Sequence, residues 1–286
     1  RRHTRYISVT WSSDVCSSDL KAGSATRFMT ANSRIIEMSR WLSSPMGSYV
    51  LQWEQFCVGQ AVMDTFGYHA LQLGLPQLDA LRENRMPHRW LALRDRETAS
   101  DSIDTAVSPL QCDFDALPFP SQSLDLVVLP HALELSNDPH LTLAEVERVL
   151  VPEGRVMILG FNPHSLWGWS GRWHQVVKPS SADLPSTPPI QAALAYRRVR
   201  DWLRLLSFEV EDARFGCWRP AVASPQWLDR LRWWDRVGER WWPVLGGVYF
   251  ITAVKRVRGM RLVGLARRQA RQNSRAKNPS WITHHE

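Results

Sequence analysis

The stretch CDFDALPFPSQSLDLVVLPHALE, Cys112 to Glu134, decides the fold. Its centre, LDLVVLP from Leu124 to Pro130, is a continuous apolar run with the length of one strand. Such a run is typical of a strand that helices cover on both faces. His131 and Glu134 follow it directly, at the end of the strand where open α/β sheets bind their ligands. The stretch therefore predicts a central parallel strand with polar side chains at its carboxyl end.

Strand and helix patterns alternate on either side of this stretch. Apolar residues at helical spacing predict helices over 46–66, 138–150 and 190–208, and Asp138-Pro139 is typical of a helix start. The other predicted strands cover 68–74, 88–93, 106–112, 155–161, 208–215 and 248–256. This alternation favours an α/β fold with a mostly parallel sheet and an antiparallel edge strand.

Charge divides the chain into a neutral body and a basic end. The net charge is +7. Residues 257–286 carry seven basic residues against one acidic residue, whereas residues 21–256 sum to about zero. We expect a main domain over 48–256, an N-terminal extension over 21–47 and a disordered basic tail over 257–286. The tail is also where an RNA contact by counterion release would lie.

The first twenty residues differ from the rest of the chain. WSSDVCSSDL, Trp11 to Leu20, has no apolar rhythm and lacks the apolar core of a secretory signal. It resembles one reading frame of a DNA-sequencing adapter. We therefore expect residues 1–20 to be a non-native leader; a disordered arm is the alternative.

Cysteine spacing and the length of apolar runs argue against a disulfide-rich, a metal-binding and a transmembrane protein. Cys16, Cys57, Cys112 and Cys217 are far apart and form no CxxC pair, so we expect neither a disulfide framework nor a metal site. No run approaches the roughly 20 apolar residues of a transmembrane helix. We expect a protein of the reducing cytoplasm.

The decisive stretch resembles the type-11 family of class I S-adenosylmethionine-dependent methyltransferases. The matching positions are Asp113 after the third strand, the turn Leu117-Pro118-Phe119, the fourth strand from Leu124 to Val127, and His131 followed by Glu134. EVERVLVPEGRVMILGFNP, Glu145 to Pro163, resembles the next helix, turn and strand of the family. FNPHSLWG and WLRLLSFEV are similar to a bacterial subgroup of it.

This resemblance covers about residues 48–256 and has definite implications. It implies a Rossmann-like fold with a seven-stranded sheet and helices on both faces. It also implies S-adenosylmethionine as cofactor and in-line transfer of its methyl group to an acceptor that the sequence does not identify. The alternative is a methyltransferase fold that no longer catalyses and serves as a binding module, on RNA through the tail 257–286.

The turn after the first strand departs from the family pattern. The family has an acidic residue and three glycines there, which let the backbone approach the cofactor closely. This chain has LQLGLPQ, in which Gln72 replaces the acid and Gly74 is the single glycine. Pro76 offers no N–H donor. This departure is what favours the non-catalytic alternative.

The resemblance places a site at the carboxyl ends of the strands. The implied cofactor contacts are Gly74, Leu75, Asp95, Asp113, Phe114 and Pro130. Asp95 would accept hydrogen bonds from the ribose hydroxyls and Asp113 from the adenine amino group, with Phe114 against the ring. The alternatives are a surface aspartate at 95 and a turn-forming aspartate at 113.

His131, Asn162 and Trp167 are the expected residues of the substrate pocket, with His131 as the candidate catalytic base. The alternative for His131 is a capping histidine on a turn. The alternative for Asn162 is an Asx turn before Pro163.

Tryptophan is concentrated late in the chain. In QWLDRLRWWDRVGERWWPVL, Gln226 to Leu245, a helix over 226–242 would place Trp227, Leu231, Trp234 and Trp241 on one face. The first interpretation is a flank that packs on the sheet. The second is an interfacial helix at a membrane, against which the balanced charges of the segment argue.

Overall fold

The computed structural model describes residues 31–94, 107–169, 193–222 and 224–256. Its strands are β1 (His69–Leu73), β2 (His88–Leu93), β3 (Ser108–Gln111), β4 (Leu124–Pro130), β5 (Leu150–Phe161), β6 (Phe208–Gly216) and β7 (Val248–Lys255). Its helices are α1 (Ala31–Leu42), α2 (Pro45–Met63), α3 (Ala132–Leu135), α4 (Pro139–Val149), α6 (Tyr196–Leu205), α7 (Pro225–Arg230) and α8 (Arg232–Trp241), with a 3-10 turn η3 (Pro243–Leu245). The leader 1–20, the tail 257–286 and Asp95 lie outside the described residues.

The seven strands form one sheet in the order β3-β2-β1-β4-β5-β7-β6. Strands β1 to β5 pair in parallel, whereas β7 runs antiparallel to both β5 and β6. The predicted mostly parallel seven-stranded sheet is confirmed. The reversed strand β7 lies next to the edge, and β6 forms the edge itself.

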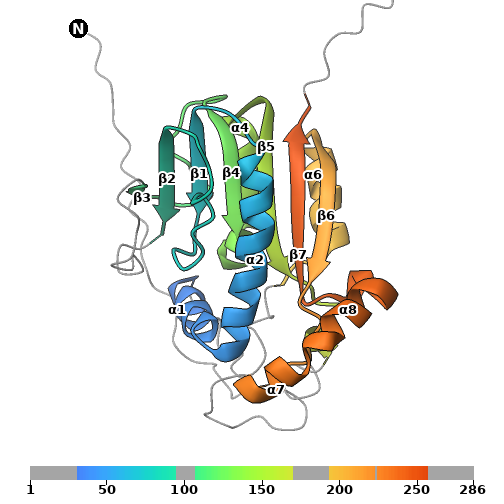
Figure 1. Cartoon of the computed structure of the whole chain (residues 1–286). Coiled ribbons are helices and arrows are strands. Elements are labelled where there is room, and N and C mark those ends of the chain that lie inside the picture. The colour runs from blue at the N-terminus through green and yellow to red at the C-terminus, as the bar shows by residue number, and fades with distance from the viewer. Residues whose placement is uncertain (1–30, 95–106, 170–192, 223, 257–286) are drawn as a thin grey trace, which may run out of the picture.

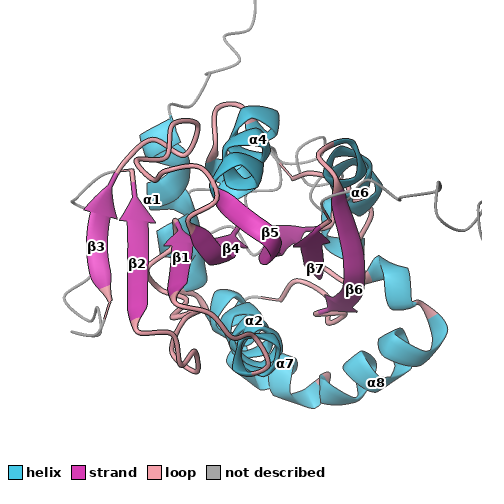
Figure 2. Ribbon diagram, turned by 90° about the horizontal axis from the view of Figure 1, so that it is seen from above, coloured by secondary structure: helices cyan, strands magenta, loops and turns pink. Residues whose placement is uncertain are grey.

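Helices cover both faces of the sheet, as predicted (Figure 1). Helix α2 lies on one face and α4 and α6 on the other, and Figure 2 shows this separation along the strands. The apolar run of β4 lies at the centre, and Leu126 to Leu129 are fully buried. Each such side chain contributes about 1.5–3 kcal/mol relative to an exposed one, so the decisive stretch also forms the centre of the core.

Local hydrogen bonds fix where the elements begin. Ser44 caps α2 by accepting from the Gly47 N–H, with Pro45 in the first turn. Asp138 caps α4 by accepting from the N–H groups of His140 and Leu141. Both helices thus start as the Ser/Asp-then-Pro pattern indicates.

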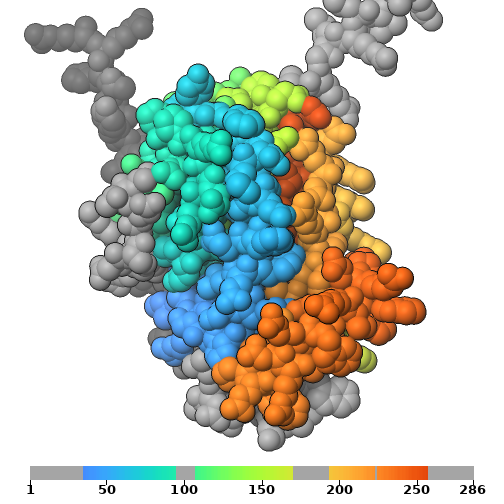
Figure 3. Space-filling model, viewed as in Figure 1, coloured from blue at the N-terminus to red at the C-terminus, as the bar shows by residue number. Residues whose placement is uncertain are grey.

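The packed core extends back beyond the expected start at residue 48. Ile35, Met38, Trp41 and Leu42 of α1 are buried in one cluster with residues from the carboxyl ends of the strands. Figures 1 and 3 show α1, in blue, at the end of the molecule to which β1, β2 and β4 point. Helix α1 therefore closes the ligand-binding edge of the sheet.

The tryptophan-rich segment differs from the expected single helix. It forms α7 and α8, which meet at Leu231. Leu228 and Gly238 are buried, whereas Trp227, Trp233 and Trp241 are exposed. In the part of the chain that the structure describes, no helix combines the length and apolar character needed to cross a bilayer.

Candidate functional site

The carboxyl ends of β1, β2 and β3 enclose a small space. Gly74, Leu75 and Phe114 line it, together with Ile35 of α1. Gly74 has a φ of +77°, and a Cβ on it would lie 3.5 Å from the Phe114 ring. The cavity measures about 10 Å³, which is room for about one water molecule. In this arrangement α1 fills the place where a ligand of an open α/β sheet binds.

Gln72 organises the turn that departs from the family pattern. Its buried amide nitrogen donates to the carbonyls of Leu75 (3.0 Å) and Leu78 (2.7 Å), and its oxygen accepts from the Ala80 N–H (3.1 Å). A carboxylate has no donor for these carbonyls. The glutamine therefore holds the turn through its amide, and the Gly74 N–H is occupied by the Ala92 carbonyl.

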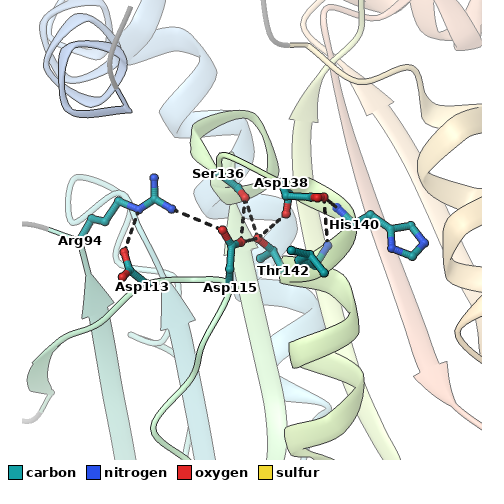
Figure 4. Close-up of polar contacts among 8 residues, drawn as sticks. Arg94, Asp113, Asp115, Ser136, Asp138, His140 and Thr142 are labelled. Atoms are coloured by element: carbon teal, nitrogen blue, oxygen red, sulfur yellow. Dashed lines mark hydrogen bonds and ion pairs between the residues drawn. The ribbon is translucent and has the colours of Figure 1, made fainter. Parts of the chain in front are cut away.

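Arg94 lies at the rim of the same space, directly after β2 (Figure 4). Its guanidinium group is 3.7 Å from Asp113 and 3.9 Å from Asp115, and it stacks over the Phe114 ring at 5.4 Å. Asp113 is 77% exposed, so its carboxylate is open to a ligand. Asp115 instead accepts from Thr142 at 2.6 Å and from Ser136, which ties the loop to α4.

Phe114 is itself buried, with 1% of its surface exposed. It lines the space together with Gly74 and Leu75, as the resemblance implies. Pro130, also buried, ends β4 with its carbonyl 3.9 Å from the position of a Cβ on Gly74. The structure thus brings five of the six expected cofactor contacts, Gly74, Leu75, Asp113, Phe114 and Pro130, to one region, and Asp95 lies outside the described residues.

His131 occupies a fully buried cluster at the carboxyl end of β4. Its Nε2 lies 2.7 Å from Oε1 of Glu54 in α2, and its Nδ1 lies 2.9 Å from Oε2 of Glu134 in α3. Glu134 also accepts from the Phe161 N–H at 2.6 Å. The three residues connect α2, the β4–α3 corner and the end of β5.

The two carboxylates control the protonation of His131. Burial alone lowers the pKa of the imidazole, but Glu54 and then Glu134 more than offset it and raise the pKa to about 10. Burial also raises the pKa of Glu134, against the lowering effect of His131. The imidazolium therefore donates to both carboxylates at neutral pH. A histidine with both nitrogens protonated and engaged is not a general base, so this geometry argues against the expected catalytic role.

The backbone conformation and the packing of His131 also argue against a role as a general base. Its φ is 50°, in the left-handed region, which costs a residue other than glycine about 1 kcal/mol. Its ring packs against Phe161 with centroids 4.2 Å apart, and its N–H donates to the Leu159 carbonyl. The ring is thereby turned into the core rather than into an open pocket.

Asn162 and Trp167 also differ from the expected pocket residues because both are buried. The Asn162 amide donates to the carbonyls of Val244 (2.8 Å) and Gly246 (3.0 Å). Its oxygen accepts from the His164 N–H, which is the Asx turn named as the alternative. The Trp167 indole donates to the Arg219 carbonyl at 2.6 Å. Both side chains hold the 162–169 segment against the chain that leads into β7.

Sequence reasoning missed Glu54, Arg94 and the role of Gln72. A signal existed for Glu54, because it shares a helical phase with the buried residues Val50, Cys57 and Val58. A carboxylate on such a face needs a buried partner. The pairing itself joins residues 77 positions apart and is set by the fold.

A larger hollow lies elsewhere on the surface. It measures about 480 Å³ and is lined by residues of α2 and of the turn after β1, among them Phe56, Gln77 and Glu83. It is open and holds a single titratable side chain, Glu83. The strand ends remain the better candidate because a carboxylate, a guanidinium group and an aromatic ring converge there.

Parts of the chain are similar to known proteins. Residues 89–158 match the model of a methyltransferase domain family, type 11. This segment runs from β2 to β5 and includes Arg94, Asp113, Phe114 and His131.

Two relatives match parts of the chain. YafS of Escherichia coli is 37% identical over 108 residues, which are 37% of this chain and 42% of YafS. A malonyl-[acyl-carrier protein] O-methyltransferase of Halorhodospira halophila is 41% identical over an alignment of 104 residues, gaps included, which covers 31% of this chain and 35% of that enzyme. The chain thus spans less than half the length of these curated relatives.

A solved structure shows the same fold. It is a methyltransferase in complex with the Trm112 methyltransferase activator of Haloferax volcanii, with a TM-score of 0.53 and 20% identity. The match covers 77% of this chain and 98% of that one.

Proposed function

We propose, on the premise that the chain belongs to the type-11 family of class I methyltransferases, that it transfers a methyl group from S-adenosylmethionine to an acceptor. The observation that carries the proposal is the convergence of Gly74, Phe114 and the exposed Asp113 at the carboxyl ends of β1 to β3. The positions and residue types fit the cofactor: a bare glycine turn, an aromatic ring and an acceptor carboxylate.

The cavity is too small for the cofactor as long as α1 stays in this position. A cavity of about 10 Å³ cannot hold a nucleoside, since ligand pockets measure roughly 300–1,000 Å³. Ile35 is the side chain that α1 contributes to the cavity wall. We propose that displacement of α1 opens the edge, after which Phe114 packs against the adenine and Asp113 accepts from its amino group.

The cofactor, when bound, supplies an activated methyl group, so the protein contributes alignment and exclusion of water. Leu75, Phe114 and Leu135 provide an apolar wall around the space. We propose that His131 is a positioning residue: through Glu54 and Glu134 it fixes the corner after Pro130. In this arrangement no side chain of the Glu54–His131–Glu134 cluster acts as a base.

A second candidate function is a binding module with a methyltransferase fold and no catalysis. The closed cavity and the occupied Gly74 N–H favour it. The RNA contact proposed for the basic tail 257–286 belongs to this candidate and rests on sequence charge alone. For both candidates we propose the cytoplasm, because the described cysteines Cys57, Cys112 and Cys217 are free thiols.

Calorimetry of the full chain with S-adenosylhomocysteine separates the two candidates. We expect saturable binding, and about tenfold weaker binding for Asp113→Asn, because a charged hydrogen-bond acceptor is lost. Asp212→Asn, in the edge strand β6, is the matched control and should bind like the wild type. Absence of heat and of any thermal shift at millimolar ligand would overturn methyl transfer and leave the binding module.

A further inference from the structure

Helices α7 and α8 expose an unusual amount of tryptophan. Trp227, Trp233, Trp241 and Trp242 are 55, 53, 70 and 52% exposed, and Val244 and Leu245 continue the apolar surface. We call these six residues, with Arg232, Arg236 and Arg240, the Trp–Arg face. Scattered exposed apolar residues are ordinary, but several large aromatic ones in one short segment indicate an interaction surface.

The spacing along α8 sorts this face into two stripes. Trp233, Val237 and Trp241 are four residues apart, so they follow one line along the helix. Arg232, Arg236 and Arg240 have the same spacing, one residue earlier, and form a neighbouring line. An apolar line beside a basic line is the pattern of helices that lie in the interface of an anionic membrane.

The side of α8 that faces away from the arginine line packs on the body of the protein. Gly238 is buried, and a Cβ on it would lie 2.3 Å from the Trp218 ring, so the helix backbone packs directly on that indole. The Trp218 indole donates to the Trp242 carbonyl at 3.0 Å. These contacts fix α8 on the body of the protein, and the residues of the Trp–Arg face stay exposed. Figure 3 shows α7 and α8, in orange, at the surface.

The charges on the surface are less balanced than the sequence indicates. Asp235 is turned inward, where it accepts from the Tyr49 hydroxyl at 2.5 Å and pairs with Arg219 at 2.9 Å. Four arginines, the three of the face and Arg230, then stand against the exposed Asp229 and Glu239. Among the described ion pairs, none engages Arg232, Arg236 or Arg240. Their guanidinium groups are thus available for lipid phosphates.

From these observations we propose that the Trp–Arg face docks on the surface of an anionic lipid bilayer. The indoles of Trp233 and Trp241 insert at the headgroup level, where an amphipathic ring is well placed. The arginines bind the lipid phosphates beside them. Figure 1 shows α7 and α8 at the same end of the sheet as α1, so docking brings the carboxyl edge of the sheet close to the bilayer.

Vesicle co-sedimentation of the full chain tests the proposal. The probes are vesicles of phosphatidylcholine with one quarter phosphatidylglycerol, and vesicles of phosphatidylcholine alone. We expect binding to the first and at least tenfold weaker binding to the second. The double variant Trp233→Ser, Trp241→Ser should lose at least tenfold on anionic vesicles. The matched control Phe66→Ser, Tyr68→Ser removes two exposed aromatic side chains near the amino end of β1 and should bind like the wild type.

The basic tail is present in every one of these proteins, so it cannot account for a difference between them. Equal binding of the double tryptophan variant and the wild type would overturn the proposal, as would equal binding to both vesicle types or no binding at all. If the variant does not fold, a second measurement decides: fluorescence quenching by vesicles of brominated phosphatidylcholine and phosphatidylglycerol. It uses a background in which the tryptophans outside the face at positions 11, 169, 173 and 281 are replaced by phenylalanine, since Trp169 is 74% exposed. Strong quenching supports insertion of the face, and absence of quenching overturns it.

Discussion

The two halves of the carboxyl edge of the sheet are built in opposite ways. At the ends of β1 to β3, apolar groups enclose a small space and the charges of Arg94 and Asp113 lie at its rim. At the ends of β4 and β5, the charges of Glu54, His131 and Glu134 lie inside, fully enclosed by the core. The proposed displacement of α1 would open the first half. The second half cannot open without exposing the Glu54–His131–Glu134 cluster, which joins α2, α3 and β5.

The difference teaches that a polar motif at a ligand-binding edge need not contact a ligand. His131 has the position expected of a catalytic residue, yet its side chain and that of Glu134 join elements of the core. The rigid half gives the other half a fixed surface against which α1 moves in the proposed opening. Substitutions in either half test this difference.

Replacing His131 should have the largest effect. His131→Ala leaves Glu54 and Glu134 as buried carboxylates with no cation between them, and we expect a loss of about 3–5 kcal/mol in the free energy of unfolding. Urea denaturation measures it, with His140→Ala as the exposed control. If the two variants are equally stable, the cluster is not structural and the contrast between the two halves fails.

The pH dependence of stability should follow from the same cluster. The folded pKa of His131, about 10, lies above its ordinary value of 6.5. The stabilisation is therefore complete below pH 6.5 and declines as the pH rises toward 10, by about 1.4 kcal/mol per pH unit. Urea denaturation between pH 6.5 and 8.5 measures this slope, below the range in which Cys57 and Cys112, with pKa values of about 11, titrate. The triple variant Glu54→Gln, His131→Gln, Glu134→Gln has no titratable group in the cluster and should be nearly flat over that range. An equal slope in this variant and the wild type would contradict the assignment.

In the other half of the edge, the side-chain amide of Gln72 holds the turn after β1. Gln72→Glu restores the acidic residue of the family pattern but removes the donor to the Leu75 and Leu78 carbonyls, so we expect a loss of about 2 kcal/mol in the free energy of unfolding. Gln55→Glu is the control, because the Gln55 amide donates to one carbonyl, that of Asp79, at a partly exposed site. Unchanged or higher stability of Gln72→Glu would show that the turn does not need this amide.

The smallest effect is expected at Gly74. Gly74→Ala places a Cβ on a residue with φ of +77° and should cost about 1 kcal/mol. Gly59→Ala, inside α2, should instead stabilise by about 0.5–1 kcal/mol, because its Cβ meets an ordinary contact and alanine favours the helix. Thermal unfolding distinguishes the two signs. Unchanged or higher stability of Gly74→Ala would mean that the turn is not constrained.

The sequence predicted best the strands that are buried on both faces. β4 and β7 are such strands, so each appears in the sequence as a continuous apolar run. The helix caps at Ser44 and Asp138 depend on hydrogen bonds to residues nearby in the chain. The helix α1 was not anticipated within the core, because its role depends on contacts with distant strand ends. Five of the six expected cofactor contacts, Gly74, Leu75, Asp113, Phe114 and Pro130, lie in one region, and their role in cofactor binding stays a prediction. His131, Asn162 and Trp167 did not form an open pocket, because their partners Glu54, Gly246 and Arg219 are set by the tertiary structure.

The reversed strand β7 has a topological consequence. Because β6 runs parallel to β5 and β7 returns between them, the chain leaves β6 and re-enters β7 at the edge where the candidate site lies. The connection over 217–247 therefore starts and ends at that edge. α7 and α8 lie in this connection, so the Trp–Arg face stands beside the candidate site although no strand of the sheet contributes to it.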